Sequence, residues 1–139
     1  MSTLRTNALE GVDAKNSITI VAGAGNITTT NVQEGLCKAW INMDAGQTTN
    51  DSFNVSSIAD VGTGQHTINF NNDFANTRHV SSLHGKEDTG SSHNSSVDRM
   101  VGPSRVAADA SLLKITGINL SGTITDLAEI FVSTHGYLA

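Results

Sequence analysis

The sequence has little positive charge, a single cysteine and no long apolar run. Its eight Lys and Arg residues are scattered and its net charge is −5, so no basic stripe is available to hold a nucleic-acid backbone. Cys37 has no partner for an internal disulfide, and we interpret it as a small buried residue rather than a reactive thiol or metal ligand. No window approaches the ~20 apolar residues of a membrane span, and residues 1–11 lack the apolar run of a signal peptide. We therefore expect a soluble chain, made in a cytoplasm, without a membrane span or a nucleic-acid partner.

What the sequence does contain is uncharged polarity. Thr, Ser and Asn supply 44 of the 139 residues, whereas charged residues supply 15%. This composition is typical of short strands and turns rather than of helices rich in Ala, Glu and Lys. A chain of this length suits one compact domain with a core of its own. We predict an all-β fold, an antiparallel β-sandwich of about seven or eight strands, with a jelly-roll-like arrangement or a small barrel as alternatives.

The most regular strand pattern lies in residues 51–70, DSFNVSSIADVGTGQHTINF. Apolar or aromatic residues at alternate positions are typical of two half-buried strands. The residues that we expect to face the core of this hairpin are Phe53, Val55, His66, Ile68 and Phe70. Between the two runs, Gly62 and Gly64 follow Asp60 and can adopt the positive φ angles of a hairpin loop. The segment therefore reads as a β-hairpin.

Further apolar or alternating runs predict the remaining strands. These runs are residues 17–23, 37–43, 105–107, 112–118 and 127–132. The connector NLSGTITD, with Gly122, is typical of the tip of a second hairpin between the last two runs. Trp40 lies within a strand, beside Cys37 and Met43, and we expect it to be a buried structural residue.

The domain organisation follows from where these runs stop. Residues 1–16 are interpreted as an N-terminal arm, and residues 17–139 as the sandwich domain. Residues 85–103 are rich in Gly, Ser and charge and contain the only proline, so they predict a long loop that contacts something outside the domain. Its expected contact residues are His84, Lys86, Glu87, Asp88 and His93.

No motif for catalysis or cofactor binding stands out. His84 and His93, with Glu87 and Asp88 between them, would converge on a metal only if the loop folded back. AGAGN at residues 22–26 lacks the third glycine and the following helix of a dinucleotide loop, and no serine has a nucleophile-elbow context. We interpret His66 as a buried structural histidine with its hydrogen bonds satisfied. His79 and His135 read as surface or interface residues. The sequence therefore predicts no enzyme activity, no metal and no cofactor.

Several stretches of the sequence resemble a known group of proteins. KAWINMDAG at residues 38–46 is followed by DSFNVSSIADVGTGQHTINF at 51–70 and FANTRHVSS at 74–82. These stretches resemble a module repeated in virion proteins of tailed bacteriophages, especially marine ones, in which a KAWVNF strand precedes a DSFNVSSITDNGTGDYTVNF hairpin. The ending LLKITGINLSGTITDLAEIFVSTHG is similar to the closing hairpin of that module, and MSTLRTNALEG resembles its opening STLKVNTI. The sequence departs from the module at His66, where Tyr is usual, and at Met43, where Phe is usual.

The resemblance implies a non-enzymatic structural protein of the phage virion, made in the host cytoplasm. Such a protein would belong to a tail fibre or to a neck or collar appendage. Appendages of this kind commonly form symmetric homotrimers, and exposed strand edges favour association, so we expect a homotrimer that also contacts other virion proteins. The polar arm would dock by adding to a neighbouring sheet edge. Its expected docking residues are Thr3, Leu4, Arg5 and Thr6.

Two other functions stay open from the sequence. A capsid decoration (cement) protein would share the size, acidity and trimeric state, and would differ in its position on the particle. A carbohydrate-binding module that contacts a host surface glycan would need aromatic platforms, and the chain has one Trp, one Tyr and four Phe. This scarcity argues against strong sugar stacking by a single chain, although not against a site shared between subunits.

Overall fold

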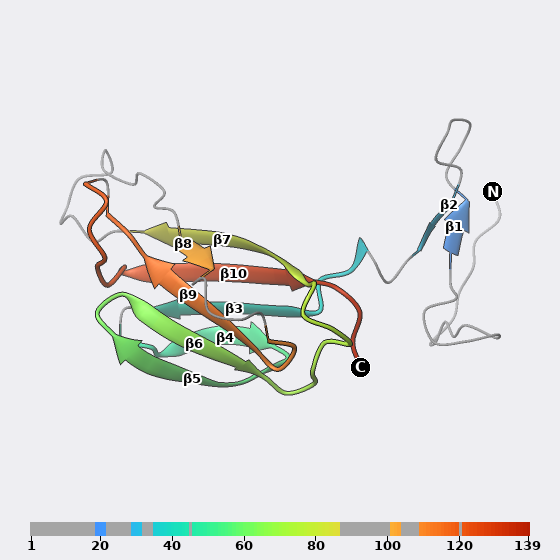
Figure 1. Ribbon diagram of the computed structural model, residues 1–139, viewed down its shortest axis with the longest axis horizontal. Helices are drawn as coiled ribbons and strands as arrows, with labels where there is room; N and C mark the ends of the chain where they lie inside the picture. The colour runs from blue at the N-terminus through green and yellow to red at the C-terminus, as the bar shows by residue number, and fades with distance from the viewer. Residues whose placement is uncertain are drawn as a thin grey trace. The chain divides into compact units, whose positions relative to one another are not determined.

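The computed structural model describes residues 19–21, 29–31, 35–44, 46–86, 101–103, 109–119 and 121–139. All ten named elements within these ranges are β-strands (Figure 1). The chain divides into two units, Met1–Leu36 and Cys37–Ala139. No helix in the described ranges has the length and apolar character needed to cross a membrane.

The N-terminal unit contains one small sheet. Strands β1 (Thr19–Val21) and β2 (Thr29–Asn31) pair antiparallel along their whole length. The strand expected at residues 17–23 is therefore present, but it belongs to this unit and not to the sandwich. Because the backbone partners of β1 come from β2, β1 adds no strand to the larger sheets. The chain divides after Leu36, so the boundary expected after residue 16 does not coincide with the division between the two units.

The second unit is built from two four-stranded antiparallel sheets. One has the order β4-β3-β10-β7 and the other the order β5-β6-β9-β8. The strands of the first sheet are β3 (Ala39–Asp44), β4 (Thr49–Phe53), β7 (Val80–Lys86) and β10 (Glu129–His135). Those of the second are β5 (Val55–Gly62), β6 (Gln65–Phe70), β8 (Val101–Pro103) and β9 (Leu112–Gly117). The predicted all-β antiparallel sandwich is confirmed, and the sheets do not close into the alternative barrel.

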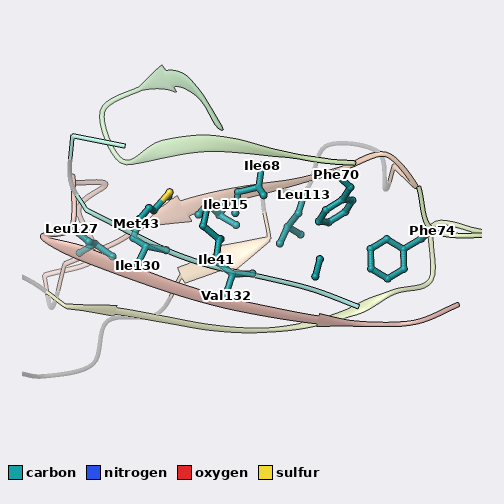
Figure 2. Packing of buried hydrophobic residues seen from close by; sticks show 11 residues of the cluster. Ile41, Met43, Ile68, Phe70, Phe74, Leu113, Ile115, Leu127, Ile130 and Val132 are labelled. Carbon is teal, nitrogen blue, oxygen red and sulfur yellow. The ribbon is translucent and has the colours of Figure 1, made fainter. Parts of the chain in front are cut away.

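The core lies between the two sheets and follows the period of two along each strand. On β3, Ala39, Ile41 and Met43 are buried, and the residues between them are partly exposed. The facing strands supply Ile68 and Phe70, which were both expected in the core. Figure 2 shows these side chains pointing toward one another from both sheets. Burying an Ile, Leu or Phe side chain contributes about 1.5–3 kcal/mol, so this layer is the main apolar support of the fold.

Residues 51–70 form a strand and a hairpin rather than one hairpin. The chain leaves β4 after Phe53 and enters β5, in the other sheet, at Val55. Asn54 makes this corner with a φ of 57°, and its side chain both accepts from the Asn72 backbone N–H (2.8 Å) and donates to the Asn72 carbonyl (3.1 Å). Phe53 therefore stays on the first sheet, where it is 52% exposed, and its expected place in the core is wrong. Val55 is partly buried against the core.

The turn between β5 and β6 is held by residues at the two ends of the connection between β9 and β10. Gly62 and Gly64 both have positive φ angles, 150° and 65°, as the sequence predicted. The Gly64 carbonyl accepts from the Gly117 N–H at 2.7 Å, and the Gly64 N–H donates to the Asp126 carboxylate. A Cβ at Gly64 would overlap the Thr125 backbone, so glycine is required there by space as well as by φ.

The second predicted hairpin is wrong. β9 and β10 lie in different sheets and do not pair with each other. Their connection forms a local turn, in which an isolated bridge joins Ile118 to Ile124 and Gly122 has a φ of 80°. The Asn119 side chain accepts hydrogen bonds from the Ser121 and Thr123 N–H groups, and this closes the turn locally. The chain then crosses to the other sheet instead of returning along β9.

The expected loop at residues 85–103 begins and ends in strands. β7 continues to Lys86, where Gly85 occupies an inward position opposite Ile130 without needing room for a side chain. Val101–Pro103 forms β8 at the edge of the second sheet. Glu87, Asp88 and His93 of the expected contact loop, and the strand expected at 105–107, lie outside the described residues.

Candidate functional site

The alternation that buries one side of β3 places its tryptophan on the other side. Ala39, Ile41 and Met43 face the core, so Trp40 and Asn42 face away from it. Trp40 is partly buried and is not a member of the apolar core cluster. The expectation that Trp40 is a core residue beside Met43 is therefore wrong, because the two residues lie on opposite faces of the sheet.

Two phenylalanines share this side of the sheet. Phe53 of β4 lies directly opposite Trp40, and residues paired in this way project to the same face at about 5 Å between Cβ atoms. On the other side of β3, Trp40 is opposite Ser133, and Phe131 lies two residues before Ser133 in β10. Such diagonal neighbours lie about 7–8 Å apart, within reach of aromatic side chains. Phe53 is 52% exposed and Phe131 is 39% exposed, so these rings are open to solvent.

We call this surface the outer face, meaning the side of sheet β4-β3-β10-β7 that is turned away from the core. Register and burial assign thirteen residues to it. They are Trp40, Asn42, Asp44, Asp51, Phe53, Val80, Ser82, His84, Lys86, Glu129, Phe131, Ser133 and His135. The face thus combines three of the six aromatic side chains of the chain with hydroxyl, amide and carboxylate groups.

The polar groups of the outer face stand beside the rings. The Asn50 side-chain amide donates to the Asn42 Oδ1 at 3.1 Å, which fixes the orientation of the two amides. Asp51 lies opposite Asn42 in the register, and its Oδ1 also accepts from the Ser52 N–H at 2.8 Å. His84 lies opposite Phe131 and is exposed. The Asn42 amide, held by Asn50, and the Asp51 carboxylate therefore share the outer face with the aromatic rings.

The charge of the outer face is predominantly negative. Lys86 is its lysine, and its Nζ lies 3.6 Å from the Glu129 carboxylate. Asp44 accepts from the Thr48 N–H at 2.8 Å, and Asp51 adds a further carboxylate. Both partners of the Lys86–Glu129 pair are exposed, so this ion pair contributes only about 0–1 kcal/mol to stability. Since three carboxylates face one ammonium group, anions are disfavoured here.

Within the core, His66 differs from its expected state. It is 2% exposed, as predicted. Among the described residues, no group lies within hydrogen-bond distance of either ring nitrogen. The hydrogen bonds expected for His66 are therefore not made by the described part of the chain, and a buried polar group without a partner costs about 1–3 kcal/mol.

The second sheet carries a small hollow. Its volume is about 180 Å³, and it lies over strands β6 and β9. Its lining residues are Val61, Gln65, His66, Thr67, Lys114, Ile115 and Thr116. Thr67 and Lys114 are register partners there, as are Gln65 and Thr116. These groups offer hydrogen bonds and one cation, but no nucleophile paired with a base.

Cys37 and Lys38 stand just before β3. The Cys37 thiol is partly buried and donates to the Ala39 carbonyl at 3.1 Å, so it has a structural role. Burial lowers the pKa of Lys38, and the nearby Cys37 opposes this shift. In the ranges that the structure describes, no three His, Cys, Asp or Glu side chains gather in a way that could hold a metal ion.

The remaining predicted residues lie apart from one another. His79 contacts the core, because its ring packs 4.8 Å from that of Phe74 and its Nε2 lies 3.0 Å from the Asp109 carbonyl. His135 is partly exposed at the end of β10. The docking residues Thr3, Leu4, Arg5 and Thr6 lie outside the described residues.

Sequence reasoning missed Phe131. The signal was present in EIFVSTH, because Phe131 alternates with Ile130 and Val132 and must face the opposite side if those two face the core. No protein-family model, curated protein or solved structure matches the chain.

Proposed function

We propose that this chain is a non-enzymatic structural component of a tailed-phage particle, belonging to a tail fibre or to a neck or collar appendage. The observation that supports it is that the stretches resembling phage virion proteins coincide with the strands of the sandwich. Residues 38–46 contain β3, residues 51–70 contain β5 and β6, and the ending from Leu112 contains β9 and β10. The resemblance thus extends over strands of both packed sheets and not over one turn motif.

The surfaces of the sandwich suit a protein that works by contact. Each sheet has two edge strands, β4 and β7 in one and β5 and β8 in the other. Strand edges offer backbone N–H and C=O groups to a neighbouring chain. These edges support assembly with other virion proteins, and we propose a homotrimer made in the host cytoplasm.

The N-terminal arm is the proposed docking element. Its Thr3, Leu4, Arg5 and Thr6 would pair with a sheet edge on the particle, as an extended segment does in strand addition. Deletion of residues 2–9 is expected to leave the sandwich folded, because the sandwich belongs to the separate unit Cys37–Ala139.

Location on the particle is the experiment that tests the function. Antibodies raised against the purified chain would be applied in immunogold electron microscopy to particles of the phage whose genome encodes it. Gold at the tail or neck is expected, and gold spread over the head would instead indicate a capsid decoration protein. Absence of the chain from purified particles, with the chain present in infected cells, would overturn the proposal. Particles carrying the 2–9 deletion should lack the chain, and full incorporation would exclude docking by the arm.

A further inference from the structure

The outer face has the mixed composition of a surface that binds sugars. Trp40 and Phe53 are cross-strand partners and Phe131 is diagonal to Trp40, so three aromatic residues share one face of a sheet on adjacent strands. The C–H side of a sugar ring can stack on such rings, whose faces are electron-rich. The sequence argument from scarce aromatics loses its force, because only Phe70 and Phe74 of the six are buried in the core.

The polar groups beside the rings can form hydrogen bonds with the hydroxyl groups of a sugar. Asn42 and Asn50 hold each other at 3.1 Å, and each amide keeps further donor or acceptor capacity. The Asp51 carboxylate, opposite Asn42, accepts hydrogen bonds from hydroxyl groups. A few fixed polar groups among aromatic side chains are the usual means by which a site orients a neutral ligand.

The charge of the outer face selects among saccharides. Asp44, Asp51 and Glu129 outnumber Lys86, and Lys86 is already paired with Glu129. The chain as a whole carries a net charge of −5. Sulfated or uronic-acid chains, phosphates and nucleic acids would therefore meet repulsion on approach. A neutral saccharide pays no such penalty.

The same features argue against a second copy as the occupant. If the outer face met the same face of a second copy, the carboxylates of Asp44, Asp51 and Glu129 would lie against a surface of equal charge. The apolar surface is also broken, because the residues in line with Trp40 on β10 and β7 are Ser133 and Ser82. Protein interfaces are depleted of charged residues at their centre. The outer face does not meet that description.

We propose that the outer face binds neutral saccharide chains, with Trp40, Phe53 and Phe131 as stacking platforms and with Asn42 and Asp51 as hydrogen-bonding groups. The proposal rests on the proposed function in that it names the partner of a contact surface. The bound sugar would be a neutral glycan displayed on a cell or particle surface.

The chain carries its own reporter for this site. Trp40 is the only tryptophan, so intrinsic fluorescence of the full chain comes from an indole on the outer face. Titration would use cellohexaose, maltohexaose, xylohexaose and mannohexaose, with a heparin hexasaccharide as the anionic comparison. A saturable change in emission with at least one neutral hexasaccharide, insensitive to salt, is expected. Phe131→Ala should weaken that binding about tenfold, the loss expected when one of a few stacking contacts is removed.

Controls separate the site from general effects. Val61→Ala removes a side chain that is 62% exposed on the other sheet, and it should leave the titration unchanged. Trp40→Ala, followed by calorimetry, should abolish binding while its circular dichroism spectrum stays that of the parent.

Three results would overturn the proposal. They are no response to any neutral hexasaccharide, a response confined to heparin and lost on adding salt, or equal binding by Phe131→Ala and the parent. Self-association in sedimentation equilibrium that Phe131→Ala abolishes, without a saccharide response, would assign the face to a second copy instead. Each of these outcomes leaves the immunogold result untouched, so failure of the saccharide proposal is distinct from failure of the virion proposal.

Discussion

The two sides of sheet β4-β3-β10-β7 are made by the same strands and have opposite compositions. On the inner side, Met43 and Ile130 are 0% exposed and pack into the core. On the outer side, Phe53 and Phe131 are 52% and 39% exposed, beside amides and carboxylates. A shift of one position along a strand therefore moves a large apolar side chain from the buried inner face to the exposed outer face.

The comparison teaches that size and hydrophobicity do not assign a residue to the core. Trp40 is the largest side chain of β3, yet its two neighbours along the strand, Ala39 and Ile41, are buried and Trp40 is not. Because the core between the sheets already receives every second residue, an aromatic residue out of that phase is left for the surface. Exposed aromatic residues grouped on one face are uncommon in a monomer and indicate a contact site.

The largest loss of stability is expected at Gly64, where the turn packs directly against the Thr125 backbone. Gly64→Ala places a Cβ against the Thr125 backbone at a φ of 65°, so both overlap and strain oppose it. We expect a loss of about 3 kcal/mol or more in the free energy of unfolding, measured by urea denaturation. Gly62→Ala is the matched control, because its φ of 150° is strained but its Cβ would meet open space. Equal losses in the two variants would show that Asp126 and Thr125 do not clamp the turn.

A much smaller effect on stability is expected on the outer face. Trp40→Ala removes a partly buried side chain outside the core cluster, so the free energy of unfolding should fall by about 1 kcal/mol. A core Trp would cost about 3–5 kcal/mol on truncation. Urea unfolding followed by circular dichroism gives the value without relying on the indole. A loss of about 3–5 kcal/mol would show that Trp40 contributes to stability as a core residue does, and would contradict the contrast between the two faces.

The smallest effect concerns an exposed carboxylate that supports the fold locally. Hydrogen bonds from the Ser111 N–H and hydroxyl, at 2.9 and 2.8 Å, lower the pKa of Asp109. Because the folded pKa lies below the unfolded value of about 3.9, the contribution is present above that pH and disappears as pH falls through the folded pKa. Asp109→Asn keeps an acceptor oxygen and removes the charge. It should be slightly less stable than the parent at neutral pH and equal to it in strong acid. A difference that grows with acidity would contradict this sign.

Much of the fold could be predicted from local pattern. The period of two in QHTINF identified Ile68 and Phe70 as core residues, and the glycines of VGTG identified the turn. The change of sheet at Asn54 could not be predicted in this way, because DSFNVSSI alternates without a glycine or proline to mark a corner. The partner strands of β9 and β10 are set by contacts between residues far apart in the sequence. The turn closed by the Ile118–Ile124 bridge has the sequence pattern of a hairpin tip, although β9 and β10 do not pair.

The candidate site was predictable in part. The apolar run at residues 37–43 predicts the strand that carries Trp40, but the size and hydrophobicity of the indole point to the core, whereas Trp40 lies on the opposite face. Phe131 was hidden in an apolar run that reads as continuous until Ile130 and Val132 are known to face the core. That Trp40, Phe53 and Phe131 lie together depends on the register of three strands, which no short stretch of sequence contains.

The measurement that tests the account most directly compares two adjacent residues of β10. Ile130 is 0% exposed and Phe131 is 39% exposed, and each would be changed to Ala in the full chain. Urea unfolding followed by circular dichroism should show a loss of about 2–5 kcal/mol for Ile130→Ala and about 1 kcal/mol for Phe131→Ala, although the second removes more atoms. Saccharide titration by Trp40 fluorescence should show the reverse, with binding about tenfold weaker in Phe131→Ala and unchanged in Ile130→Ala under conditions where that variant is folded. Equal destabilisation by the two variants, with no difference in the titration, would contradict the division of this sheet into a folding face and a contact face.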